Sequence, residues 1–98
     1  MKFNEALGTA IRAVRADQAL TLRELSARSY VSMGHLSDVE NGNKEASSDV
    51  IDSLAKGLGI PAYDLIIEAG YLMSDFEVPN TAASLLSAHS QNGLTLQM

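Results

Sequence analysis

Hydrophobic residues recur every three or four positions along the first part of the chain, which predicts short amphipathic helices. The earliest stripe predicts a helix over residues 3–18 and consists of Phe3, Leu7, Ile11 and Val14. A later stripe runs from Val50 to Leu58, behind a Ser47-Ser48 cap. Gly59 follows this stripe directly, as glycine commonly does at the end of a helix.

Capping signals predict two further helices between these stripes. Thr21 and Glu24 have the spacing of a capping box, in which each side chain bonds the other residue's backbone N–H. Leu20 and Leu25 flank the cap as a hydrophobic staple, so a short helix is expected over residues 22–29.

The next helix is expected over residues 32–41, with Ser32 as its cap and Val31 and Leu36 as its staple. The Asn41-Gly42-Asn43 sequence ends it. Leu36 and Val39 then face inward, one turn apart. The residues expected to point outward are Gly34, Ser37, Asp38 and Asn41.

The remainder of the chain predicts a fifth helix and a tail. Pro61 is typical of a helix start, and we expect Gly70 to close that helix. Residues 71–79 are interpreted as a connector. Helical spacing then returns and predicts a short helix that needs a surface to dock on, through Ala82, Leu85, Leu86 and His89. The fold class is therefore all-α, with a five-helix domain over residues 1–70 and a helical tail over residues 71–98.

Composition limits the class of protein. Hydrophobic residues make up 46% of the 98 positions, which is enough for a core, and aromatic residues only 5%, so the core is expected to consist of Leu, Ile, Val and Ala. The absence of cysteine excludes disulfides and thiolate metal sites. No apolar run approaches the roughly 20 residues of a membrane span, and the start lacks a signal-peptide pattern. These features predict a soluble cytoplasmic protein with no metal or other cofactor.

The net charge of −5 is unevenly distributed and does not exclude nucleic acid as a partner. Residues 1–46 contain six cationic and six acidic side chains, whereas residues 47–98 contain one lysine and six acids. The whole excess of negative charge therefore belongs to the second part. The neutral first part can still present a locally basic face.

The two short helices at 22–29 and 32–41 are joined by only Tyr30 and Val31. A tight corner of this kind allows its second helix to protrude into the major groove of DNA, which is about 12 Å wide. The sequence shows no catalytic arrangement of nucleophile and base and no glycine-rich phosphate loop, so an enzyme is not expected.

Residues 21–42 resemble the helix-turn-helix of the Cro/CI-type repressor family. The most characteristic part is Leu-Ser-Asp-Val-Glu-Asn-Gly at residues 36–42, with the Ser-Ser cap that follows, and the resemblance extends over about residues 5–70. Residues 5–12 and 43–48 are more narrowly similar to actinobacterial regulators of Clp protease genes. The resemblance implies a lambda-repressor-like domain and a transcriptional activator of protein quality-control genes.

The resemblance also implies residue roles. It places four residues on the groove-facing part of the recognition helix, namely Met33, Gly34, Ser37 and Asp38. Thr21 and Ser32 match capping positions that often touch phosphate. Arg15 matches an arginine that pairs with the glutamate matching Glu40.

The loop after the recognition helix matches one that meets the DNA backbone, through Asn41, Asn43 and Lys44. Related sequences commonly have basic residues at the two asparagine positions, so weaker binding with a shallower salt dependence is expected. Met33 can touch a thymine methyl group, and Asp38 can accept a hydrogen bond from a cytosine amine.

Further contacts are expected from charge and position. His35 lies near the start of the recognition helix and is a candidate contact to base or phosphate, with a pH sensor and a plain surface residue as the alternatives. At least two arginines are expected to contact phosphate, out of Arg12, Arg15, Arg23 and Arg28.

The expected function is sequence-specific binding of double-stranded DNA by a homodimer. Its dimer surface is expected within residues 60–98, through Tyr71, Leu72, Phe76, Leu85 and Leu86. An acidic face could also attract RNA polymerase. Two alternatives remain, an antitoxin-like module whose tail covers a partner protein and a protein-binding domain that has lost its affinity for DNA.

Overall fold

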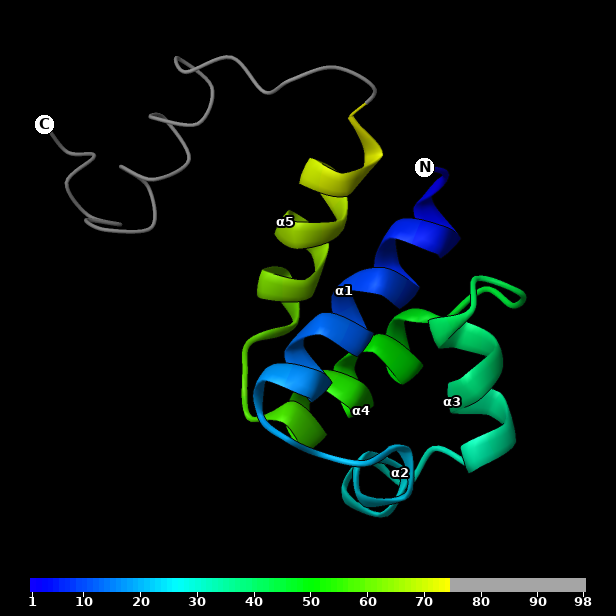
Figure 1. Ribbon diagram of the computed structural model, residues 1–98, viewed down its shortest axis with the longest axis vertical. Helices are drawn as coiled ribbons and strands as arrows, with labels where there is room; N and C mark the ends of the chain where they lie inside the picture. Colours follow the sequence, from blue (N-terminus) through cyan, green and yellow to red (C-terminus); the bar gives the residue numbers. More distant parts are fainter. Residues whose placement is uncertain (75–98) are drawn as a thin grey trace, which may run out of the picture.

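The computed structural model describes residues 1–74, which form five α-helices and no strand (Figure 1). The helices are α1 (Phe3–Asp17), α2 (Leu22–Ser29), α3 (Met33–Glu40), α4 (Ser48–Leu58) and α5 (Ala62–Met73). The all-α class is confirmed, as are the caps at Thr21, Ser32 and Ser47. None of these helices is long and apolar enough to cross a membrane.

The predicted end of the fifth helix is wrong, because α5 continues through Gly70 to Met73. A glycine inside a helix costs only about 1 kcal/mol relative to alanine, so it does not by itself stop one. Leu72 continues the inward stripe of Leu65 and Ala69 and packs against the core, which favours another helical turn. Residues 71–73 are therefore helix rather than connector. The predicted tail helix, with Phe76, Leu85, Leu86 and His89, lies outside the described residues.

The core is aliphatic, as the composition predicts, and every helix contributes to it. Its buried hydrophobic residues are all Ala, Leu, Ile or Val. The largest fully buried side chains are Leu7, Ile11, Leu25, Leu36, Leu54, Leu65 and Val39. The first helix, α1, packs against both α5 and α3, and Figure 1 shows those two helices on opposite sides of it.

Two glycines inside helices allow unusually close packing beneath α2 and α3. A Cβ atom on Gly8 of α1 would lie 2.3 Å from the backbone oxygen of Val39 in α3. A Cβ atom on Gly57 of α4 would lie 3.2 Å from the backbone nitrogen of Ser29 in α2. The lost helix propensity of about 1 kcal/mol at each position is offset by this close approach. Both helices of the corner are thereby held against the scaffold.

Candidate nucleic-acid interface

The corner formed by α2 and α3 is the candidate interface. The inner side of α3 is covered, because Leu36, Val39 and Glu40 are buried. Its outer side begins with Met33 and Gly34, which are exposed. A Cβ atom on Gly34 would have no neighbour within 4 Å in the described part of the chain, so this surface is open.

Both helices of the corner begin at a side-chain cap. The hydroxyl of Thr21 accepts a hydrogen bond from the backbone N–H of Glu24 (3.0 Å), and the Glu24 carboxylate accepts one from the backbone N–H of Thr21 (2.8 Å). These interactions with Thr21, the backbone hydrogen bond first, hold the pKa of Glu24 below its ordinary value. At α3, the Ser32 hydroxyl accepts from the backbone N–H of His35 (3.2 Å). Each cap stabilises the fold by about 1 kcal/mol.

The turn between the helices is held by two serines of α2. The Ser26 hydroxyl donates to the backbone oxygen of Val31 (2.6 Å), and the backbone N–H of Val31 donates to the Ser29 hydroxyl (3.3 Å). Between them, Tyr30 has a left-handed backbone with φ of 62° and a side chain that is 95% exposed. The turn is therefore well defined and projects one aromatic ring into solvent.

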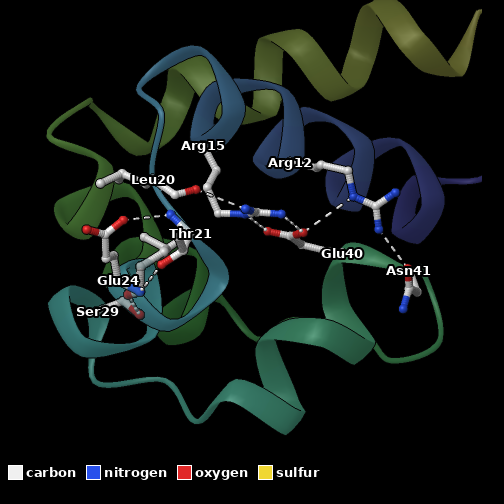
Figure 2. Close-up of polar contacts among 9 residues, drawn as sticks. Arg12, Arg15, Leu20, Thr21, Glu24, Ser29, Glu40 and Asn41 are labelled. Atoms are coloured by element: carbon white, nitrogen blue, oxygen red, sulfur yellow. Dashed lines mark hydrogen bonds and ion pairs between the residues drawn. The ribbon is translucent and has the colours of Figure 1, made fainter.

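An ion pair ties the end of α3 to α1. Arg15 binds both carboxylate oxygens of Glu40, with Nε to Oε2 at 2.7 Å and Nη2 to Oε1 at 2.9 Å (Figure 2). The Glu40 side chain is only 3% exposed, and the hydrogen bonds to it raise the pKa of Arg15. The remaining nitrogen, Nη1 of Arg15, donates to the backbone oxygen of Leu20 at 3.0 Å. This pairing confirms the one implied by the family resemblance.

A second arginine of α1 extends this network to the loop after α3. Arg12 donates from Nε to Glu40 Oε1 (3.4 Å) and from Nη2 to Asn41 Oδ1 (2.7 Å). Figure 2 shows Glu40 lying between the two arginines. Sequence reasoning missed the role of Arg12 in holding Asn41, because residues 29 positions apart meet only in the folded chain.

The structure places the predicted reading residues together on α3 and in the following loop. Met33 and Gly34 are exposed, and the other three on the helix are half-buried, namely His35, Ser37 and Asp38. The loop residues are exposed, and they are Asn41, Asn43 and Lys44. An exposed ion pair joins Lys44 Nζ to Asp38 Oδ2 at 3.9 Å.

The predicted arginine contacts divide into two groups. Arg23 and Arg28 lie exposed on α2. Arg15 instead directs its guanidinium into the network with Glu40 and Leu20. Sequence reasoning also gave no role to Gly8, although a glycine inside a helical pattern signals close packing.

A different surface, on α5, is apolar. Its exposed large hydrophobic residues are Tyr63, Ile66, Ile67 and Met73. Of the predicted dimer residues within the described chain, Tyr71 is half-buried and Leu72 packs against the core. The helical spacing of Leu65, Ala69 and Leu72 marks the inward face of α5. The residues between them, which lie on the opposite face, could therefore have been predicted to face outward.

Comparison with known proteins supports this reading of the corner. The helix-turn-helix family model matches residues 11–65. Over 70 residues the chain is 39% identical to the transcriptional regulator ClgR of Mycobacterium tuberculosis, covering 71% of this chain and 62% of that protein. It is 36% identical over 69 residues to the transcriptional repressor RghR of Bacillus subtilis, covering 69% of this chain and 51% of the repressor.

Solved structures show the same arrangement. The crystal structure of the clp gene regulator ClgR from C. glutamicum superposes with a TM-score of 0.74 at 45% identity, covering 78% of this chain and 99% of that one. The restriction-modification controller protein C.Esp1396I gives a TM-score of 0.70 at 13% identity, covering 79% of this chain and 99% of the controller, a likeness of fold alone.

Proposed function

This chain belongs to the helix-turn-helix family of transcriptional regulators, and we propose that it reads duplex DNA as a homodimer and activates genes of protein quality control. The observation that carries the DNA-binding part is the rigid mounting of α3. Glu40, paired with Arg15, and the close crossing at Gly8 hold one side of this helix. Its other side stays open at Met33 and Gly34.

In this proposal α3 enters the major groove. Met33 contacts a thymine methyl group, and Asp38 accepts from a cytosine amine once its exposed pair with Lys44 opens. Gly34 lets the helix backbone come close to the bases. Ser37 and His35 complete the reading surface on α3.

The DNA backbone is met by residues around the corner. The cationic contacts are Arg23, Arg28 and Lys44, all of them exposed. Thr21 and Ser32 lie at helix starts, where backbone N–H groups and hydroxyls suit phosphate. Asn41 and Asn43 add neutral contacts, while Arg15 acts by positioning α3. With only three cationic contacts to the DNA backbone, the affinity for DNA is expected to depend only modestly on salt concentration.

Homodimer formation is proposed through α5 together with the tail. Ile66, Ile67 and Met73 expose apolar surface there, beside Tyr71. A single small reading head binds weakly, whereas two heads recognise half-sites about 34 Å apart. Phe76, Leu85 and Leu86 remain proposed parts of this interface.

The regulated genes are inferred from the relatives. The similar proteins of M. tuberculosis and C. glutamicum carry the name ClgR, and the latter is described as a clp gene regulator. We extend to this chain a role in activating protease genes, exercised in the bacterial cytoplasm where the chromosome lies, without enzymatic activity or cofactor. RNA polymerase is the partner that activation would require.

Selection of bound duplexes from a random pool, at stated salt, tests the proposal most directly. We expect a near-palindrome whose half-sites are about one helical turn apart. Failure to bind duplex DNA of any sequence at low ionic strength would refute the function.

The exposed apolar residues of α5 also suit an alternative, an antitoxin-like module that covers a partner protein. Purification separates the two functions. The regulator is expected as a homodimer on its own, whereas the module would co-purify with a toxin. A truncation after Gly70 that stays dimeric would remove residues 71–98 from the proposed interface.

A further inference from the structure

We propose that Tyr30 is a DNA-backbone contact, whose phenol hydroxyl donates a hydrogen bond to a phosphate at the edge of the groove that α3 enters. This inference rests on the proposed DNA-binding function and adds a contact that the family resemblance did not supply. Three features of Tyr30 support it: its backbone conformation, the exposure of its side chain and the hydrogen bonds that hold its backbone.

The backbone of Tyr30 is in an unfavourable conformation for a residue with a side chain. Its φ of 62° and ψ of 21° lie in the left-handed region. There the Cβ atom crowds the following carbonyl, and helices that end in this way usually have glycine or asparagine at that position. In the same chain, Gly59 ends α4 with φ of 71°. Ala19 after α1 is also left-handed, with φ of 57°, but it carries only a methyl group, so the large side chain at the end of α2 still needs an explanation.

The folded domain does not supply that explanation. With 95% of Tyr30 exposed, its ring contributes almost nothing to the packing of residues 1–74. Its neighbours Ser29 and Val31 are both buried, so the chain turns its polar and aliphatic residues inward at this point and its aromatic ring outward. An aromatic ring with a polar tip that is left in solvent is typical of a contact surface.

The ring is also rigidly mounted at its base. The backbone N–H of Tyr30 donates to the backbone oxygen of Ser26 at 2.9 Å. On the next residue, both the N–H and the carbonyl of Val31 are bonded to serine hydroxyls of α2. Little backbone freedom is thus lost when the ring meets a partner, which favours binding.

The position of Tyr30 selects the DNA backbone as its ligand. Val31 and Ser32 alone separate it from the first turn of α3, the end of a recognition helix that approaches the bases. Bases within a duplex are stacked and offer no face to the ring, whereas phosphate oxygens line the groove edge. A phenol O–H is an uncharged donor, and tyrosine is among the residues that commonly contact phosphate.

The test compares Tyr30→Phe with the wild-type chain on a selected operator duplex and on a mixed-sequence duplex, over a salt series. The phenylalanine keeps the ring and removes only the hydroxyl. We expect binding to weaken by about threefold to tenfold per half-site on both duplexes, with an unchanged salt slope because no charge is lost. Unchanged affinity would overturn the proposal, and so would a loss confined to the operator, which would indicate base reading.

Two matched variants calibrate the salt slope. Arg28 and Lys56 are exposed cations in the last turns of α2 and α4. Arg28→Gln is expected to reduce the slope by about 1, and Lys56→Gln to leave it unchanged. If the salt dependence of DNA binding by Tyr30→Phe is reduced as much as that of Arg28→Gln, the contact made by Tyr30 is not that of a neutral donor.

Stability gives a separate readout. Tyr30→Gly relieves the left-handed strain, and we expect it to raise the melting temperature by about 2–5 °C while weakening DNA binding at least as much as Tyr30→Phe. A melting temperature lowered by more than the about 4–8 °C that glycine's extra freedom in the unfolded state explains would show that the ring supports the fold and would overturn the proposal. If the wild-type chain binds neither duplex, the proposed function itself fails. If it binds both and Tyr30→Phe binds equally well, only the role of Tyr30 fails.

Discussion

The outward faces of α3 and α5 lie on opposite sides of α1 and are both accessible, but their chemistry differs (Figure 1). After Met33, the outward face of α3 presents Gly34, Ser37 and Asp38, whereas α5 exposes Ile66 and Met73. Small and polar groups remain hydrated until a polar partner such as a DNA groove replaces the water. Apolar groups gain by leaving water altogether, which favours a protein partner. Both surfaces are exposed, so it is the chemistry of their side chains that indicates which kind of partner each one suits.

The inner faces of the same two helices differ as well. Leu65, Ala69 and Leu72 attach α5 through aliphatic packing. By contrast, α3 adds a buried carboxylate at Glu40 and a backbone contact at Gly8. Hydrogen bonds and backbone contacts have narrower geometric tolerance than aliphatic packing. A helix that reads bases requires that narrower placement.

Loss of the polar attachment of α3 should change stability the most. Glu40→Ala leaves the guanidinium of Arg15 largely buried without its carboxylate, and we expect a loss of about 3 kcal/mol in the free energy of unfolding. Urea denaturation measures it. The double variant Arg15→Met with Glu40→Met should lose less than Glu40→Ala alone, because no buried unpaired charge remains and Arg12 is exposed to solvent. A greater loss in the double variant would contradict this account.

Two glycine substitutions compare the effect on stability of adding a methyl group at the inner and at the outer face of α3. Gly8→Ala places a methyl group against the backbone of Val39 and is expected to destabilise the fold by about 1–3 kcal/mol. Gly34→Ala meets open space and should stabilise it by up to about 1 kcal/mol through helix propensity. Thermal unfolding of both variants provides the measurement. Equal effects of the same sign would show that the two positions do not differ.

The apolar face of α5 is tested by charge. Ile66→Asp should weaken self-association at least tenfold, about 1.4 kcal/mol, because a carboxylate must lose water at the interface. Thermal stability of the monomer should change little, since Ile66 is 42% exposed. Analytical ultracentrifugation follows the oligomeric state. A dimer as tight as the wild type would move the proposed interface away from this face.

Base reading by α3 predicts a smaller effect. Asp38→Ala should relax the preference at one base pair of each half-site by about 1 kcal/mol, while binding to mixed-sequence DNA stays the same or strengthens. A base-by-base binding series checks this. An unchanged preference at every position would remove Asp38 from the reading residues.

The smallest effect concerns the cap of α2 and is measured as a change in how stability depends on pH in acid. Because the folded state lowers the pKa of Glu24 from its ordinary value of 4.5, this group stabilises the fold above that pH. The contribution is lost as the pH falls through the lowered pKa. Glu24→Gln should therefore show a shallower loss of stability below about pH 4.5 than the wild type. Identical acid profiles from circular dichroism would contradict it.

The starts of α2 and α3 were predictable because each depends on residues one turn apart. Thr21 with Glu24, and Ser32 with His35, lie three positions from one another. The pairing of Arg15 with Glu40 is different, since it joins residues 25 positions apart and was expected from the family resemblance. The wrong end at Gly70 has a tertiary cause, because Leu72 finds a place on the core that no local signal indicates.

Local signals in the sequence were enough to locate the helix starts, their caps and the corner of α2 and α3, because these follow from the period of the helix and from short-range hydrogen bonds. The folded arrangement was needed to show that Gly8 meets the backbone of α3, that Arg12 holds Asn41 and that Tyr30 is exposed in a left-handed turn. The first two depend on segments far apart in the chain. The third depends on a turn that is held between packed helices. Neither a long-range contact nor the conformation of such a turn can be read from the type of a single residue.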